Sequence, residues 1–235
     1  MENLPTLIET IYARQQEALT SYPGFAALED GTAARADYDA FIGDLCRAHL
    51  KSPHILAFLF SAAPPESAVN LKHNLFEELG VDGAAHPDLL LVMAAAAGFD
   101  EAERRRLQTE AQEDLRRIAT DPILFGTLRE LAFSVLAETI AYEWMLARTA
   151  SRMARFLARH RGLSDESLEW FHHHSEVDLR HAAEGIEAIV DFARYYELAP
   201  ADVEIILDVT FRENVFIKRY FRHSAAASRA GAYAV

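Results

Sequence analysis

Apolar residues recur at spacings of three and four along nearly the whole chain, and this periodicity constrains the fold more than any other feature. The spacing places apolar side chains on one face of an α-helix, whereas a half-buried strand alternates apolar and polar residues. No segment shows a sustained alternation of β-branched and polar residues between turn signals. The sequence therefore predicts an all-α protein.

Residues that break or cap helices divide this pattern into segments. Pro64-Pro65 and Gly80 fall where helices should end, and Ser164 after Gly162 can cap the next helix. We see no linker, composition shift or internal repeat, and expect one helical domain over residues 1–225 and a flexible tail over 226–235. The predicted helices cover about residues 3–20, 32–50, 52–62, 65–79, 87–97, 101–118, 122–160, 165–191 and 200–223.

Composition and charge exclude several classes of protein. With 51% hydrophobic residues in 235, the chain can build a core and is not disordered. A formal net charge of -13 repels nucleic acid and anionic lipid. No apolar stretch is long enough to cross a bilayer, and the N-terminus lacks the basic region of a signal peptide. We therefore expect a soluble cytoplasmic protein that binds neither nucleic acid nor membranes.

The chain has a single cysteine, Cys46. One cysteine excludes an internal disulfide, a thiol pair for redox work and a cluster of thiolate ligands. Any metal ion must therefore be bound by histidines and carboxylates.

The stretch from Trp170 to His181 carries the strongest candidate ligands. His174, Asp178 and His181 are spaced by four and three residues, so they lie within roughly 60° of one another on a helix, whereas His172 and His173 point away from that face. Two imidazoles and a carboxylate suit Fe(II) or Mn(II). The alternative interpretation is an exposed polar face of an acidic helix, and other segments must decide.

A second candidate group surrounds the turn at residues 79–85. Glu78 shares a helix face with Asn74, whereas Glu77 is turned roughly 100° away, so Glu78 is the better inward candidate. His86 lies just before Pro87, which suits the first position of a helix. A carboxylate at one helix end and a histidine at the next helix start can converge. A surface glutamate pair and a capping histidine are the alternative.

Two further glutamates, Glu138 and Glu143, interrupt an apolar run in the segment 131–146. Burying a carboxylate there is costly unless a cation holds it. The two side chains point roughly 140° apart around the helix, so they do not face the same centre. Periodicity does not choose between them.

Taken in order, these motifs resemble the haem-oxygenase-like non-haem di-iron oxidase and oxygenase family, over about residues 40–190. The resemblance implies a single-domain bundle of about seven main helices, and it favours Glu143 over Glu138. It implies an O₂-dependent enzyme that oxidises, desaturates or cleaves a small metabolite such as an amino acid or aliphatic carboxylic acid. It also implies two non-haem iron ions, with manganese allowed at one position. Their implied ligands are Glu78, His86, Glu143, His174, Asp178 and His181.

The chain departs from this family in two respects. Residues 47–54 contain no extra acidic ligand, so six ligands are the expected maximum. No proline follows Glu143 closely, and a straight helical hairpin would offset Glu143 from His174 by roughly 13 Å. The proposed ligand set therefore requires a bend near residues 149–151.

Other functions and partners stay open at this point. A metal-free enzyme of the same fold, either thiaminase-like or cofactor-independent, is one alternative. The thiaminase-like enzyme would need Cys46 as its nucleophile, and the neighbours of Cys46 offer no clear base. A helical interaction protein is an alternative of a different class, and a homodimer stays open. Ferritin-like bundles are disfavoured because both Glu/Asp-x2-His pairs, at 169–172 and 178–181, lie on one helix. Lys218 or Arg222 can hold a substrate carboxylate or lie on a solvated helix face.

Overall fold

The computed structural model describes residues 3–81, 83–120 and 125–223; the side chains of residues 118–120 and 176–179 lie outside the described set. The described chain is helical and contains no strand. The predicted tail at 226–235 lies outside the described residues. The helices are α1 Leu4–Thr20, α2 Pro23–Asp30, α3 Arg35–His49, α4 Ser52–Ala62, α5 Ala68–Glu78, α6 His86–Ala96, α7 Glu101–Thr120, α8 Leu128–Arg161, the 3-10 turn η1 Glu166–Leu168, α9 Glu169–Tyr195, α10 Pro200–Thr210 and α11 Val215–Tyr220.

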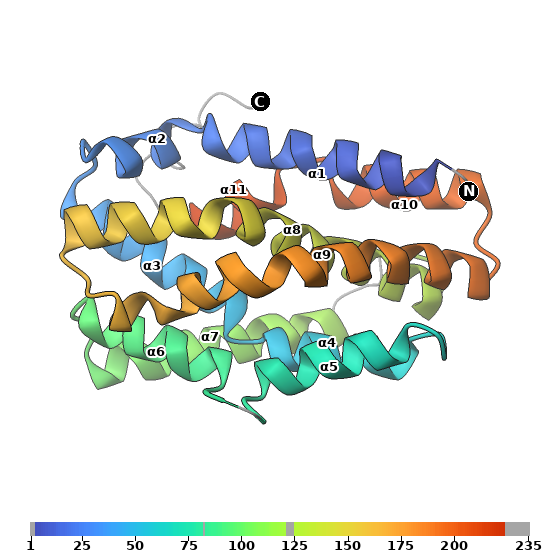
Figure 1. Cartoon of the computed structure of the whole chain (residues 1–235), viewed down its shortest axis with the longest axis horizontal. Helices are drawn as coiled ribbons and strands as arrows, with labels where there is room; N and C mark the ends of the chain where they lie inside the picture. The colour runs from blue at the N-terminus through green and yellow to red at the C-terminus, as the bar shows by residue number, and fades with distance from the viewer. Residues whose placement is uncertain (1–2, 82, 121–124, 224–235) are drawn as a thin grey trace.

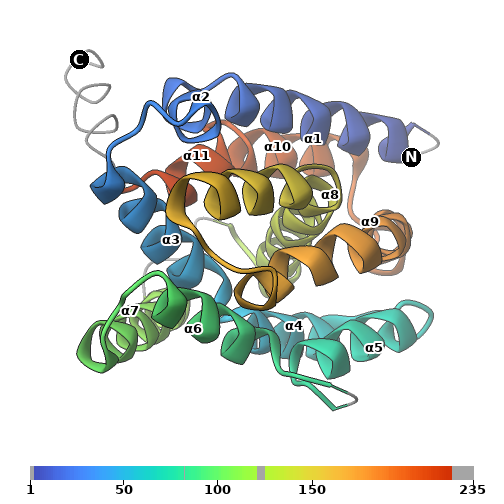
Figure 2. The same cartoon turned by 60° about the vertical axis from the view of Figure 1, so that its left-hand side comes forward.

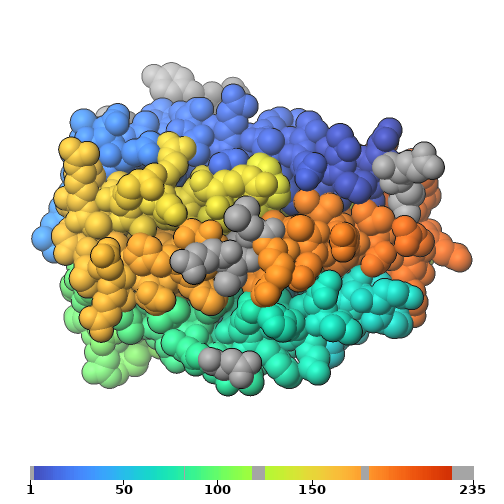
Figure 3. Space-filling model, viewed as in Figure 1, coloured from blue at the N-terminus to red at the C-terminus, as the bar shows by residue number. Residues whose placement is uncertain are grey.

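The long helices α8 and α9 pack against each other through the middle of the molecule (Figure 1). On one side of this pair lie α1, α2, α10 and α11, and on the other lie α4 to α7, while α3 joins the two sides (Figures 1 and 2). The space-filling view shows α9 lying against α5 and α6 on the visible face (Figure 3). This arrangement places the C-terminal end of α5 and the N-terminal end of α6 next to the first half of α9.

α8 is one continuous helix, and it bends between its two halves (Figure 2). Figure 2 shows the olive first half and the yellow second half of α8 running in different directions. The Thr149 hydroxyl donates to the carbonyl oxygen of Met145 at 2.7 Å, a bond that competes with the helix ladder and bends helices.

The turn between α8 and α9 confirms the signal at Gly162, whereas the predicted cap at Ser164 lies one residue before the N-cap position of η1. Gly162 has a φ of 68°, a left-handed conformation that glycine adopts without a Cβ clash, and it ends α8. The Ser164 hydroxyl accepts the N–H of Ser167 at 3.3 Å. This bond holds the chain just before the short turn η1, whose N-cap position is Asp165 and which leads into α9.

Two predicted boundaries were wrong. The stretch 21–31, which we left between helices, contains α2, because Pro23 occupies the first turn of a helix. The single helix predicted over 200–223 is divided into α10 and α11. Asn214 separates them, since its side chain accepts the N–H of Ile217 at 2.8 Å and starts a new helix.

The apolar face of each helix packs into one connected core, as the periodicity predicted. No described helix is long and apolar enough to span a bilayer. The predicted all-α fold class is confirmed.

Close contact between α8 and α9 depends on Gly185. A Cβ at this position would collide with the side chain of Ile140 on α8. We expect Gly185→Ala to lower the free energy of unfolding by about 1–3 kcal/mol, because an overpacked core must shift to accept the methyl group. Urea unfolding followed by circular dichroism measures the loss. Gly83→Ala is the control, since no atom lies within 4 Å of a Cβ there; equal stability of both variants would contradict this account of the packing.

Candidate metal centre

A cavity of about 130 Å³ lies between the central helix pair, α3 to α6 and α11. Five of the six predicted ligands line it, and they come from α5, α6, α8 and α9. The side chain of the sixth, Asp178, lies outside the described residues. The five are Glu78, His86, Glu143, His174 and His181.

Glu78, His86 and His174 form a compact, fully buried cluster. One ligand atom from each lies within 4.8 Å of the others. Nδ1 of His86 is 3.0 Å from Oε1 of Glu78, and the rings of His86 and His174 lie 4.7 Å apart. Ser52 at the start of α4 donates a hydrogen bond to Oε2 of Glu78 at 2.5 Å and fixes the orientation of the carboxylate. The convergence predicted for Glu78 and His86 is therefore present.

The backbone sets the orientation of the His174 ring. Nδ1 of His174 lies 2.7 Å from the carbonyl oxygen of Trp170. A carbonyl oxygen only accepts, so Nδ1 carries the hydrogen and Nε2 keeps its lone pair. Burial, with a smaller contribution from His86, holds the pKa of His174 well below its usual value. The ring is thus neutral at pH 7, as a metal ligand must be.

Glu143 is buried in the same cavity and is only partly hydrogen-bonded. Asn74 Nδ2 donates to Oε1 of Glu143 at 2.5 Å. Burial raises the pKa of Glu143 to about 8; the Asn74 hydrogen bond opposes this shift, and the neighbouring Glu78 adds to it. Glu138 also lines the cavity, but it lies 3.3 Å from Nη2 of Arg219 in an ion pair. Glu143 therefore keeps one carboxylate oxygen without a hydrogen-bond partner among the described residues, whereas Glu138 is paired with Arg219.

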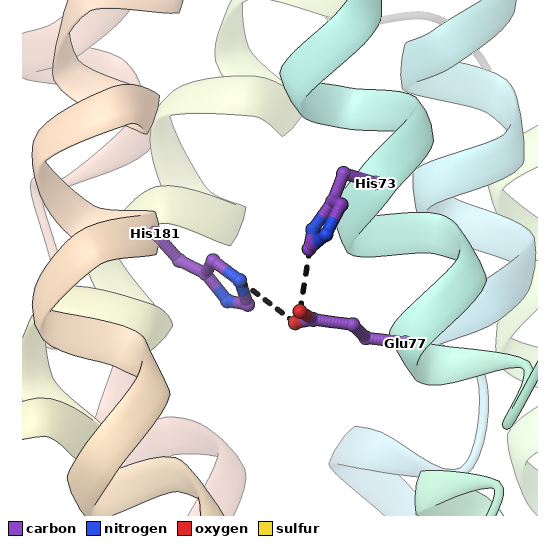
Figure 4. Close-up of side chains that lie close together, drawn as sticks. All are labelled: His73, Glu77 and His181. Carbon is purple, nitrogen blue, oxygen red and sulfur yellow. Dashed lines mark ion pairs between the residues drawn. The ribbon is translucent and has the colours of Figure 1, made fainter. Parts of the chain in front are cut away.

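His181 faces a carboxylate that the sequence analysis set aside. Its Nε2 lies 2.8 Å from Oε2 of Glu77, and Glu77 is also 3.2 Å from Nδ1 of His73 (Figure 4). Glu77 is turned from the buried face of Glu78, as expected, and it meets His181 because α9 passes on the side of α5 that Glu77 faces. Helix periodicity gives the angle between Glu77 and Glu78 but not the position of the neighbouring helix.

The cavity residues fit a metal ion. Nδ1 of His86 and Oε2 of Glu143 are buried and have no hydrogen-bond partner within the described chain. A buried polar atom without a partner is costly, and a bound cation would satisfy both atoms. Imidazole nitrogens and carboxylate oxygens without sulfur are the ligands that Fe(II) and Mn(II) accept.

Basic residues of the cavity wall were missed by the sequence analysis. Lys51 and Arg219 line the cavity, whereas Lys218 and Arg222, which we named as anion-binding candidates, are exposed. Lys218 pairs with Glu213 at 2.7 Å. The sequence analysis named this basic stretch but not Arg219, which is the residue of the stretch that faces the cavity.

His49 also lines the cavity and was not predicted. Burial, with smaller contributions from Lys51 and His86, lowers the pKa of His49 to about 3. Its Nε2 lies 2.6 Å from the hydroxyl oxygen of Tyr220. Residues 47–54 were searched only for acidic ligands, and that is why this histidine was overlooked.

Two aromatic residues beside Glu143 and the single cysteine divide between the cavity and the core. Tyr142 lines the cavity, whereas Trp144 packs on Tyr12 and Arg148. Cys46 is buried outside the cavity lining among the described residues, and burial raises the pKa of its thiol to about 12. It has the properties of an inert core residue, as expected.

Comparison with known proteins identifies the family. The model of a family described as iron-containing redox enzymes matches residues 40–207. The chain belongs to this iron-containing redox enzyme family. It is accordingly an oxidoreductase of an iron-dependent kind, and the predicted family is confirmed.

The fold is confirmed by a solved structure. A crystal structure from Shewanella denitrificans OS217, of a domain of unknown function with a heme oxygenase-like fold, matches with a TM-score of 0.64 at 17% sequence identity. The match covers 98% of this chain and 95% of that chain. No curated protein matches the sequence. The likeness shows a haem-oxygenase-like fold.

Proposed function

We propose that the protein is a non-haem di-iron oxidase or oxygenase that uses O₂ to oxidise, desaturate or cleave a small carboxylic or amino acid. One observation carries the proposal: histidines and carboxylates, two of them with unsatisfied buried atoms, converge in one cavity, and a buried lysine lines the same cavity. Two bound iron ions would supply the electrons and open coordination positions that O₂ reduction requires. Manganese fits one of the two positions.

The positions of the ligands suggest which of them would hold each of the two ions. Glu78, His86 and His174 would hold one ion, since their ligand atoms already lie within 4.8 Å of one another. Glu143 would help to hold the ions, since its Oε2 has no hydrogen-bond partner among the described residues while Asn74 fixes its Oε1. His181 and Asp178 complete the proposed set, because they share the helix face of His174.

The basic wall supports an anionic substrate. The Lys51 side chain is only 9% exposed and shares Asp114 with Arg47, at 3.1 Å and 2.7 Å. One carboxylate therefore serves two cations, so Lys51 is neutralised only in part. Burial, with repulsion from Arg219, lowers the pKa of Lys51. A substrate carboxylate would satisfy this ammonium group and orient the substrate relative to the ligands.

The apolar part of the wall defines the size and character of the substrate. Ile55, Leu56, Val135 and Leu146 line the cavity beside the charged groups. A cavity of about 130 Å³ accepts a small molecule of roughly benzene size. These side chains would hold an aliphatic body and exclude water from the reacting atoms. Short aliphatic and amino acids fit both the charge and the volume.

Oxygen consumption tests the proposal. The protein is loaded anaerobically with Fe(II), and O₂ uptake is followed with amino acids and short aliphatic carboxylic acids. We expect about two Fe per chain and faster O₂ uptake with one class of acid. Lys51→Gln should raise the acid concentration needed for half-maximal stimulation about tenfold, because a charge-assisted hydrogen bond is lost.

Exposed Lys72 on α5 provides the matched control. Lys72→Gln should leave the stimulation unchanged. A protein that binds no iron, or iron-loaded protein whose O₂ uptake no acid changes, would refute the proposal. Turnover of a pyrimidine by metal-free protein would instead favour the thiaminase-like alternative.

A further inference from the structure

A second group of potential ligands lies outside the Glu78, His86 and His174 cluster. His73 and Glu77 on α5 and His181 on α9 each offer one ligand atom, and these atoms lie within 4.8 Å of one another (Figure 4). The side chain of His73 is 59% exposed, that of Glu77 is 24% exposed and that of His181 is 3% exposed. The group therefore extends from the surface to the cavity. We call it the outer cluster.

We propose that the outer cluster binds a divalent transition-metal ion. Neither His73 nor Glu77 belongs to the ligand set given above for the two iron ions. Two imidazoles and one carboxylate make the three-ligand set that leaves open positions for water on Fe(II), Mn(II) or Co(II). The exposure of His73 gives such an ion access from solution.

An atom in the outer cluster without a hydrogen bond supports this site independently. Oε2 of Glu77 is buried and has no hydrogen-bond partner among the residues described, although Nε2 of His181 lies only 2.8 Å away. The two atoms are therefore close without the alignment that an N–H donor requires. Ligand atoms around a metal ion approach one another in this way, because each directs a lone pair at the ion.

Arg180 shows that this position attracts positive charge. Its Nη2 lies 3.0 Å from Oε1 of Glu77 and 3.2 Å from Nε2 of His181. The Arg180 side chain is 53% exposed, and its Nε is 3.9 Å from Glu184 one turn further along α9. The guanidinium can therefore turn toward Glu184 when an ion takes its place. Arg180 competes with the ion, and its removal should tighten binding.

The outer cluster is connected to the inner centre through His181. His181 lines the inner cavity as well, and one nitrogen lone pair cannot hold two ions. An ion at the outer cluster therefore excludes an ion that uses the same nitrogen inside. This relation rests on the proposed function, whereas the outer site itself does not.

Cobalt binding tests the outer site. The starting protein carries Glu143→Gln and His174→Ala, so that neither inner position has its full ligand set. We expect it to bind one Co(II) per chain, measured by calorimetry and visible absorption. Adding His73→Ala should weaken this binding at least about tenfold, since a direct ligand is lost. Adding Arg180→Gln should strengthen it.

His54 on α4 is also exposed, and His54→Ala is the matched control. It should leave Co(II) affinity unchanged. Absence of Co(II) binding, or binding that His73→Ala does not weaken, would overturn the outer site. Should the starting protein not fold, the single variant His174→Ala takes its place, and Co(II) binding that adding His73→Ala does not weaken overturns the site equally.

The two proposals fail in different ways. A wild-type chain that binds only the ion dependent on His73 keeps the outer site and refutes the di-iron centre. If the wild-type chain binds two ions but the starting protein binds no ion that depends on His73, the di-iron centre is kept and the outer site is refuted.

Discussion

The His174→Ala protein is expected to lose at least one iron ion per chain and its substrate-stimulated O₂ uptake. His174 is the buried ligand whose tautomer is fixed by the carbonyl oxygen of Trp170, so that Nε2 is available to a cation. Residues that only orient a ligand contribute about 10- to 100-fold in metal affinity, and loss of the ligand itself costs at least as much. Anaerobic Fe(II) titration with elemental analysis measures the loss.

The neighbouring histidine gives this experiment a close control. His172 is partly exposed, and its Nε2 lies 3.9 Å from Asp165 instead of lining the cavity. His172→Ala should retain full iron occupancy, and both variants should keep the helix content of the wild type. Equal iron binding by the two variants would remove His174 from the ligand set and leave the inner centre without support.

The contrast between these histidines could be predicted from the sequence. The three consecutive histidines point in different directions on a helix, and only His174 has a partner at four and seven residues downstream. The same periodicity selected Glu78, which shares a buried face with Asn74. Such predictions succeed because a single helix fixes the angle between its own side chains.

Contacts between helices explain what could not be predicted. Glu77 meets His181, and Arg219 meets Glu138, across distances of 104 and 81 residues along the chain. No helical period relates such pairs, because the crossing of two helices decides which faces meet. Resemblance to the family chose Glu143 over Glu138; both line the cavity, and what separates them is the ion pair of Glu138 with Arg219, which helix periodicity does not predict.

The cavity also explains why its cations were missed. Lys51 lies between two helices, and Arg219 lies on a stretch that is basic on several sides. The local sequence therefore does not indicate that either side chain is buried. A long charged side chain is usually solvated. Only the packed bundle shows that Lys51 is buried against Asp114.

Glu143→Gln is expected to stabilise the metal-free protein while it weakens metal binding. Burial raises the pKa of Glu143 from 4.5 to about 8, whereas the carboxyl ionises near 4.5 in the unfolded chain. Between these two pH values the folded protein keeps a proton that the unfolded chain has released. The contribution of Glu143 to stability is therefore favourable at low pH, falls as pH rises, and is lost above about pH 8.

The glutamine variant removes this dependence on pH. Glutamine keeps the oxygen that accepts from Asn74 but carries no charge that burial must neutralise. At pH 8, chelator-treated Glu143→Gln protein should exceed the wild type in free energy of unfolding by a few kcal/mol, and the difference should shrink toward pH 5. Urea unfolding at several pH values measures both trends.

Glu138→Gln is the control, because Glu138 is paired with Arg219 whereas Glu143 is buried without a cationic partner among the described residues. Glu138 contacts Arg219 at 3.3 Å, so its replacement removes an ion pair and should give no stabilisation at pH 8. Iron added to the wild type should raise its free energy of unfolding by about the amount that the buried charge of Glu143 removes. Iron should raise the free energy of unfolding of the Glu143→Gln protein much less. A wild type whose stability iron leaves unchanged would mean that Glu143 does not hold a cation, because a bound ion must stabilise the folded state that binds it.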